Sequence, residues 1–154
     1  MRRTDREIND RAAIDGIIRR SKVCHLALCD AGQPYVIPLS FGYDGVHLFC
    51  HGAGEGRKVD ILMKNNRVCF EFEILSDIIP GKEACRWGMG FESVIGFGWA
   101  RLLEQQEDKR IALGCIMRQY SNQEWTFTNE MVSKTLVIKI DIDEITGKRR
   151  DALM

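Results

Sequence analysis

The spacing of apolar and polar residues along the chain predicts short strands over much of its length. The clearest alternation covers 136–143, where an apolar side chain recurs at every second position, as it does in a half-buried strand. Gly96 and Gly98 interrupt a long strand-like run and indicate a bulge, a bend or the close approach of another backbone or a ligand. The predicted strands cover residues 23–29, 35–41, 46–51, 68–75, 93–103 and 136–143.

Helical spacing replaces this alternation in three segments. Over 7–20 the apolar residues recur on one side of a helix, and further helices are expected at 59–64 and 107–120. Residues 76–91 contain a proline and three glycines without a clear period, so we expect the longest loop there. Because short connections join most of the strands, the sequence predicts a mainly β fold, a six-stranded antiparallel barrel with helical decorations, in one domain covering 1–154.

Composition narrows the classes of function. The 22 basic residues balance the 22 acidic ones, so no global field attracts the protein to nucleic acid or to an anionic membrane. No apolar run approaches the roughly 18 residues that span a bilayer, and the charged N-terminus has no apolar core behind it, so we expect a cytoplasmic protein. The six cysteines are too sparse for a disulfide scaffold and form no Cys-x-x-Cys pair, so we expect reduced thiols and no metal site.

The segment 51–58, His-Gly-Ala-Gly-Glu-Gly-Arg-Lys, is the strongest local chemical signal. Its glycines let backbone N–H groups approach an anion, and the helix start expected after Gly56 adds unsatisfied donors. Arg57 and Lys58 contribute positive charge where it opposes the helix dipole, a placement that favours a bound anion such as phosphate. The alternative is a flexible turn followed by a solvated basic face of a helix.

The strand at 35–41 is the second candidate, because it contains Pro38 and therefore belongs at an edge or an opening of the sheet. A free edge beside Phe41 offers both the backbone polar groups and the apolar surface that a flat heterocycle such as isoalloxazine needs. An ordinary edge strand is the alternative. His51 ends the next strand beside the glycines, where it can contact a cofactor or relay a proton.

Four motifs occur in an order that resembles the nitroimidazole-resistance branch of the pyridoxamine 5′-phosphate oxidase-like family. They are Gly-Gln-Pro-Tyr-Val-Ile-Pro-Leu-Ser-Phe, Leu-Phe-Cys-His-Gly-Ala-Gly-Glu-Gly-Arg-Lys, Ser-Val-Ile-Gly-Phe-Gly-Trp-Ala and Ile-Thr-Gly-Lys. The resemblance covers nearly the whole chain and implies an FMN-binding split barrel that forms a homodimer, with one FMN in each of two clefts at the subunit interface. The chain ends soon after the fourth motif, unlike the oxidase branch, so we expect no vitamin B6 oxidase activity.

The resemblance also assigns roles to residues. It implies that Arg57 and Lys58 bind the flavin phosphate and that His51 is the catalytic candidate. FAD is the alternative to FMN, and a third possibility is haem with His25, His47 or His51 as axial ligand. The implied cofactor-binding residues are Ile37, Pro38, Leu39, Ser40, Cys50, His51, Gly56, Arg57, Lys58 and Ser93.

The expected function is that of a flavin-dependent oxidoreductase. NADH or NADPH reduces the flavin, which passes hydride or electrons to a small acceptor such as a nitroimidazole. The alternative from another class is a non-catalytic flavin-binding or redox-sensing protein whose partner is another macromolecule. Turnover of NADH or NADPH above the rate of free flavin separates the two.

Overall fold

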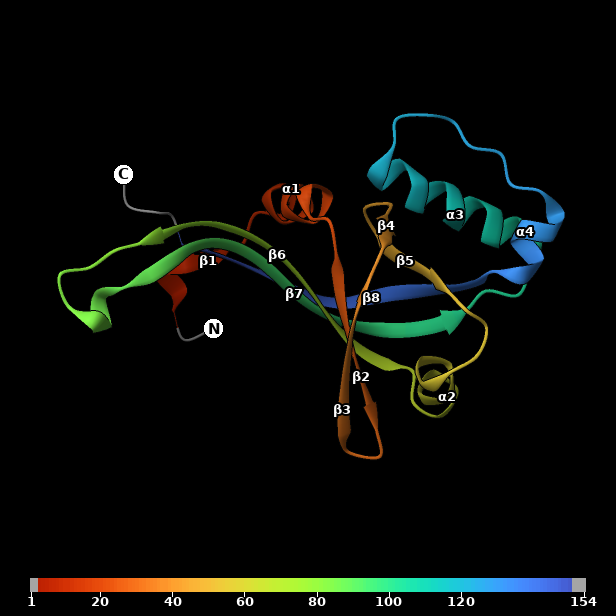
Figure 1. Ribbon diagram of the computed structural model, residues 1–154, viewed down its shortest axis with the longest axis horizontal. Coiled ribbons are helices and arrows are strands. Elements are labelled where there is room, and N and C mark those ends of the chain that lie inside the picture. Colours follow the sequence, from red (N-terminus) through yellow and green to blue (C-terminus); the bar gives the residue numbers. More distant parts are fainter. Residues whose placement is uncertain (1–2, 151–154) are drawn as a thin grey trace.

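The computed structural model describes residues 3–150, and an antiparallel sheet dominates it (Figure 1). The strands are β1 (Glu7–Ile8), β2 (Cys24–Asp30), β3 (Gln33–Leu39), β4 (Phe41–Tyr43), β5 (His47–Gly52), β6 (Arg67–Ile79), β7 (Gly88–Leu102) and β8 (Leu136–Arg150). The helices are α1 (Arg11–Arg20), α2 (Arg57–Lys64), α3 (Gln106–Tyr120) and α4 (Asn129–Lys134), with short 3-10 turns at Thr4–Arg6 and Ala84–Arg86.

The hydrogen-bonded path through the sheet runs β3-β2-β6-β7-β8-β5-β4, with β1 paired to β8. The two ends of this path, β3 and β4, are consecutive in the chain and are separated by Ser40 alone. The chain therefore passes from one edge of the curled sheet to the other at Ser40, which is the architecture of a split barrel. The predicted fold class is confirmed, and so is the expectation that Pro38 lies on an edge strand.

A continuous apolar core fills the space between the sheet and helices α1 and α2. Asp10 caps α1 through its carboxylate, which accepts hydrogen bonds from the N–H groups of Ala12 at 3.3 Å and Ala13 at 3.1 Å. Phe41 and Phe72 are fully buried in this core, with ring centroids 4.7 Å apart and ring planes tilted by 55°. A smaller cluster lies between α3, α4 and the strands β5 and β8.

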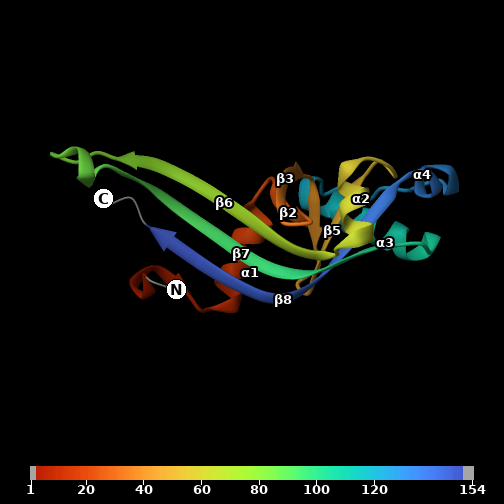
Figure 2. The same cartoon turned by 90° about the horizontal axis from the view of Figure 1, so that it is seen from below.

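The structure corrects the expected loop at 76–91. Strand β6 continues to Ile79 and β7 begins at Gly88, so the two strands form a long arm that extends away from the barrel (Figures 1 and 2). Their register shifts between Leu75 and Ile78, where β6 carries one extra residue. Such a bulge interrupts the alternation of inward and outward side chains, so the sequence there lacks the period-two pattern that indicates a strand.

Other differences from the expected elements are smaller. The expected helix at 7–20 begins only at Arg11, because Glu7 and Ile8 pair with β8 instead. Ser40 divides the expected strand at 35–41, and β8 continues to Arg150 rather than ending near 143. Helix α4 was not expected, although its start is capped by the Thr128 hydroxyl, which accepts from the Met131 N–H at 3.2 Å. No helix within residues 3–150 combines the length and apolar character that a membrane crossing requires.

Candidate functional site

The start of helix α2 presents unsatisfied donors. Gly56 precedes the helix with a φ of +104°, a conformation that other residues rarely adopt. Its carbonyl accepts from the N–H groups of Val59 at 2.8 Å and Asp60 at 3.1 Å, and no side chain caps the helix. Within the described residues, the N–H groups of Arg57 and Lys58 therefore remain available to an acceptor, as an anion site requires.

The two cations of this turn lie against different strands. The Arg57 guanidinium lies over the Tyr35 ring of β3, with Cζ 4.7 Å from the ring centroid. Lys58 Nζ lies against Gly52 at the end of β5, where a Cβ on Gly52 would overlap it. No carboxylate among residues 3–150 forms an ion pair with either cation. The turn thus carries two charges that no described carboxylate neutralises, one beside β3 and one beside β5.

The side chains of the candidate segment 37–40 divide between two faces. Ile37 and Leu39 pack against the barrel core, whereas Pro38 and Ser40 are exposed on the other face. Strand β3 pairs only with β2 among the described strands, so its other edge is free. A ligand at this edge can contact the main chain and the side chains of Pro38 and Ser40, while Ile37 and Leu39 are restricted to main-chain contacts.

The same alternation separates Cys50 from His51. Cys50 is fully buried, whereas His51 is exposed at the end of β5. A hydrogen bond with the Cys50 thiol, together with burial, raises the pKa of the Cys24 thiol well above its usual value. These two thiols belong to the core, so Cys50 can reach a ligand outside the barrel only through its main chain.

Tyr120, at the end of α3, fixes the chain at the split between β3 and β4. Its hydroxyl oxygen accepts from the Phe41 N–H at 2.9 Å, and the hydroxyl donates to the Lys22 carbonyl at 3.0 Å. Burial raises the pKa of Tyr120, while the bonds from Phe41 and Ser40 act in the opposite direction. The hydroxyl is therefore protonated at neutral pH. The sequence carried no signal for this role.

Ser93 lies inside β7 rather than at its start, paired with Glu73 on β6 and Lys148 on β8. Gly52, at the end of β5 before this turn, pairs with Leu136 at the start of β8, whereas Ser93 pairs with Lys148 near the other end of β8. Within one chain, Ser93 therefore does not join the turn that carries Arg57.

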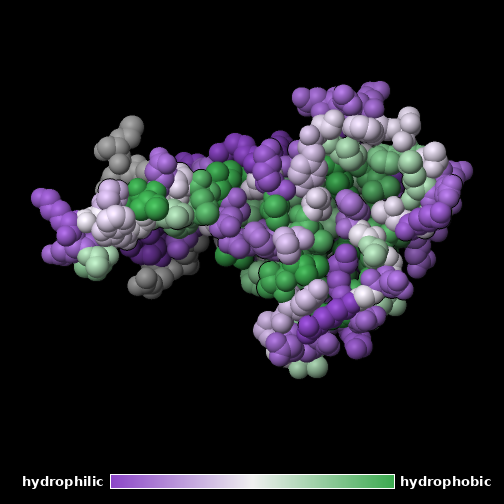
Figure 3. Space-filling view, viewed as in Figure 1, coloured by the Kyte–Doolittle hydropathy of each residue, from purple (hydrophilic) through white to green (hydrophobic). Residues whose placement is uncertain are grey.

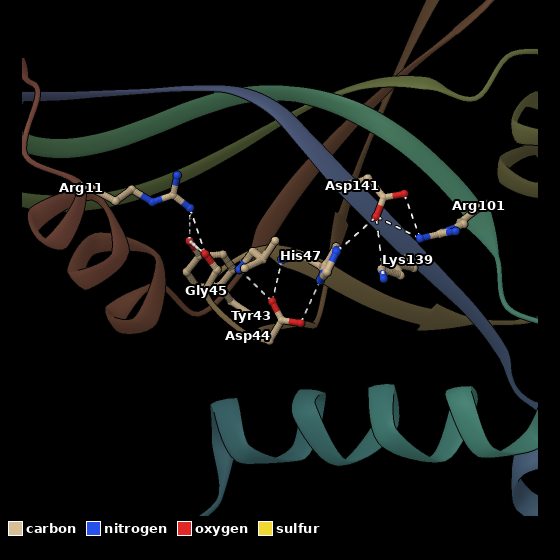
Figure 4. A network of polar contacts seen from close by, with 9 residues as sticks. Arg11, Tyr43, Asp44, Gly45, His47, Arg101, Lys139 and Asp141 are labelled. Carbon is tan, nitrogen blue, oxygen red and sulfur yellow. Dashed lines mark hydrogen bonds and ion pairs between the residues drawn. The ribbon is translucent and has the colours of Figure 1, made fainter.

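His47 lies in a network of charged groups on the side of the sheet near α3 (Figure 4). Its Nδ1 is 3.0 Å from Asp44 and its Nε2 is 3.4 Å from Asp141, which also pairs with Arg101. Burial would raise the pKa of Asp44, but hydrogen bonds from the main chain and ring of His47 outweigh it, and the pKa is lowered. His47 thus connects the turn before β5 to β8.

The spacing of His47 and His51, four residues apart, would place both on one face of a helix. Both lie on strand β5, where four residues span about 13 Å, so they cannot share one metal ion. Within residues 3–150, no group of three or more His, Cys, Asp or Glu side chains is arranged so that it could hold a metal ion.

An apolar stripe follows the outer face of β7 and continues onto the arm. Ile95, Phe97 and Trp99 are 43%, 41% and 48% exposed, and Leu75 and Met89 extend the stripe along the arm. Figure 3 shows apolar patches over the arm, between polar side chains. Arg67 lies over the rings of Phe97 and Trp99 but leaves both partly exposed. An exposed apolar stripe of this kind is typical of a surface that binds another protein.

Comparisons with known proteins agree with this architecture. The family model described as pyridoxamine 5′-phosphate oxidase matches residues 10–149. A solved structure from Bacteroides thetaiotaomicron, described as a candidate 5-nitroimidazole antibiotic resistance protein, is 33% identical, with a TM-score of 0.84. The match covers 93% of this chain and 86% of that one.

More distant structures share the fold. A FAD and haem binding protein from Mycobacterium smegmatis is 18% identical, with a TM-score of 0.87 over 95% of this chain and 74% of that one. A flavocytochrome from Azotobacter vinelandii is 21% identical, with a TM-score of 0.83 over 98% of this chain and 72% of that one. Among curated proteins, an uncharacterised protein of Rhizobium meliloti (strain 1021) is 27% identical over 64 residues, which make up 42% of each chain.

Proposed function

The chain belongs to the pyridoxamine 5′-phosphate oxidase family, and from this premise we propose that it is a flavin-dependent reductase that binds FMN. The start of α2 is the observation that carries the proposal. There, the consecutive residues Arg57 and Lys58 supply two N–H groups without a helical acceptor and two cations that pair with no carboxylate among residues 3–150. A phosphate group satisfies such donors.

The residues around this turn suit the rest of a flavin. The free edge of β3 offers main-chain groups to the ring, and Pro38 and Ser40 offer side-chain surface on the exposed face. A bound flavin supplies the two-electron redox chemistry. In this proposal His51, exposed at the end of β5, donates a proton to a small acceptor on reduction.

A homodimer completes this site in our proposal. One chain places Ser93 toward the other end of β8 from the turn that carries Arg57, and it exposes the apolar stripe of β7 beside Ser93. In this proposal, a second copy that covers the stripe brings its own Ser93 to the first copy's flavin site. The flavin would then lie at the subunit interface.

Reduction of a nitroimidazole by NADH or NADPH is the activity to test first. The 33% identical relative described as a candidate 5-nitroimidazole resistance protein supports this acceptor class. Purified protein with bound flavin should oxidise NADH or NADPH under anaerobic conditions faster than an equal concentration of free flavin when a nitroimidazole is present. His51→Ala should lower this rate without releasing flavin.

If the protein and free flavin oxidise NADH or NADPH at equal rates with several acceptors, the protein is not a reductase. A protein that binds flavin without turnover would be a flavin-binding or redox-sensing protein. The identity of the released cofactor, measured by mass spectrometry, decides between FMN and FAD, and a Soret band would identify haem.

A further inference from the structure

We propose that Tyr35 is a positioning residue that holds the Arg57 guanidinium ready for the flavin phosphate and so makes the site select phosphorylated flavins over riboflavin. This inference rests on the proposed function. Tyr35 is not among the cofactor-binding residues that the family resemblance implies. The part of the ligand that the site recognises would be the phosphate group.

The Tyr35 ring is a fixed platform. It packs against the barrel core from β3, where Tyr35 pairs with Leu28 of β2. The guanidinium of Arg57 lies over this ring, with Cζ 4.7 Å from the centroid. Arg57 comes from the first turn of α2, so the contact connects the phosphate end of the proposed site to the strand that borders the ring.

A ring is a partner that leaves the guanidinium free to bind an anion. Arginine stacks through its planar face, while all five N–H donors point outward in the plane. A carboxylate would occupy the same donors and neutralise the charge. The described residues place no carboxylate in an ion pair with Arg57, so its fork of donors remains available for phosphate oxygens.

Lys58 shows the contrasting arrangement. Its Nζ lies against Gly52, and the absence of a Cβ at Gly52 provides the space. Lys58 therefore contributes a point charge from the side of β5, and Arg57 contributes a directed fork from the side of β3. The planar guanidinium of Arg57 must be oriented toward the phosphate, whereas the ammonium of Lys58 need not be. The positioning role therefore belongs to Tyr35, whose ring lies under Arg57.

The experiment compares the affinities of FMN and riboflavin, which differ by the phosphate alone. Both ligands are titrated by fluorescence into flavin-free wild-type protein and the variants Tyr35→Leu and Tyr35→Phe. Tyr35→Leu should weaken FMN about fivefold to tenfold and leave riboflavin within about twofold, because the lost interaction acts on the phosphate. Tyr35→Phe is the matched control, since it keeps the ring, and should bind both ligands like the wild type.

A double variant checks that Tyr35 acts through Arg57. In an Arg57→Ala background, Tyr35→Leu should cause no further loss of FMN affinity. Arg57→Lys at this exposed position preserves the charge without a planar face, and should weaken FMN as Tyr35→Leu does. It tests the inference even where Tyr35→Leu fails to fold.

The outcomes separate the two proposals. Equal weakening of FMN and riboflavin by Tyr35→Leu, unchanged FMN affinity in Tyr35→Leu or Arg57→Lys, or additive losses in the double variant would overturn the positioning role alone. Wild-type protein that binds neither ligand would overturn the proposed function, and this inference with it.

Discussion

At the residue scale, the direction of each side chain decides which of the cofactor-binding residues implied by the family resemblance can contact a ligand. Sequence position alone placed Cys50 and His51 together, but consecutive residues of a strand point to opposite faces. Cys50 is buried beside Cys24, and His51 is exposed. A resemblance can therefore suggest a segment, while the backbone decides which of its side chains are available to a ligand.

The cysteines should differ sharply in reactivity. The pKa of Cys24 is raised well above its usual value by a hydrogen bond with Cys50 and by burial, so its thiolate is scarce at neutral pH. Cys85 is exposed. In native protein, an alkylating reagent should modify Cys85 first, and Cys24 and Cys50 only after unfolding, as followed by peptide mass spectrometry. Labelling of Cys24 as fast as Cys85 would contradict this description of the core.

Removal of both cations at α2 should abolish tight phosphate binding. Arg57→Ala combined with Lys58→Ala should weaken FMN by about two orders of magnitude, because charge-assisted hydrogen bonds contribute roughly 1.5–3 kcal/mol each. Both side chains are outside the apolar core, so the melting temperature of the flavin-free protein should stay within about 2 °C. Unchanged FMN affinity would refute the phosphate assignment.

At the element scale, Glu92 of β7 joins three elements. Arg20 of α1 lies 2.8 Å from one carboxylate oxygen, and Arg149 Nε of β8 lies 2.8 Å from the other. The Arg20 hydrogen bond lowers the pKa of Glu92, burial opposes this, and Arg149 lowers it further, so that the pKa lies below its usual value of 4.5. These contacts hold α1 against the long strands.

The stabilisation from Glu92 should depend on pH. Because its pKa is lower in the folded state than in the unfolded state, the contribution is complete above the unfolded value and is lost as pH falls through the folded value. Glu92→Gln should lower the free energy of unfolding by about 1 kcal/mol at pH 7 and by much less at pH 3. Urea denaturation at both values measures this. An equal loss at both would mean that charge is not the cause.

The elements that sequence patterns predicted were those with unbroken periodicity. Strand β8 alternates cleanly over 136–143, and α3 was expected within one residue of its start. The arm was missed because the extra residue between Leu75 and Ile78 shifts the register, and Ser40 gave no local sign that it divides two strands. Both features depend on pairing between distant segments, which a local period cannot report.

In the candidate site too, the sequence indicated only the features whose residues are contiguous in the chain. Glycines followed by Arg57 and Lys58 indicated the phosphate turn, because that chemistry is contiguous in the chain. The contact between Arg57 and Tyr35 and the contact of Tyr120 with Phe41 join residues that are far apart in sequence. These two contacts could be identified only from the folded structure.

At the scale of the whole molecule, the apolar stripe of β7 should be the homodimer interface. Phe97→Asp should shift the mass measured by light scattering from dimer toward monomer and weaken FMN binding, because the partner completes the cleft in our proposal. Ile111→Asp is the matched control, since Ile111 is 59% exposed on α3, outside the stripe. A dimer that survives Phe97→Asp, or dissociates equally with Ile111→Asp, would place the interface elsewhere.

Flavin binding is the central claim, and the absorbance spectrum of the purified protein tests it most directly. The protein should show the absorbance spectrum of a bound flavin, either as purified or after addition of FMN and removal of the excess, with FMN released on denaturation and identified by its mass. A colourless protein that takes up no added flavin would contradict the account and leave only the split barrel.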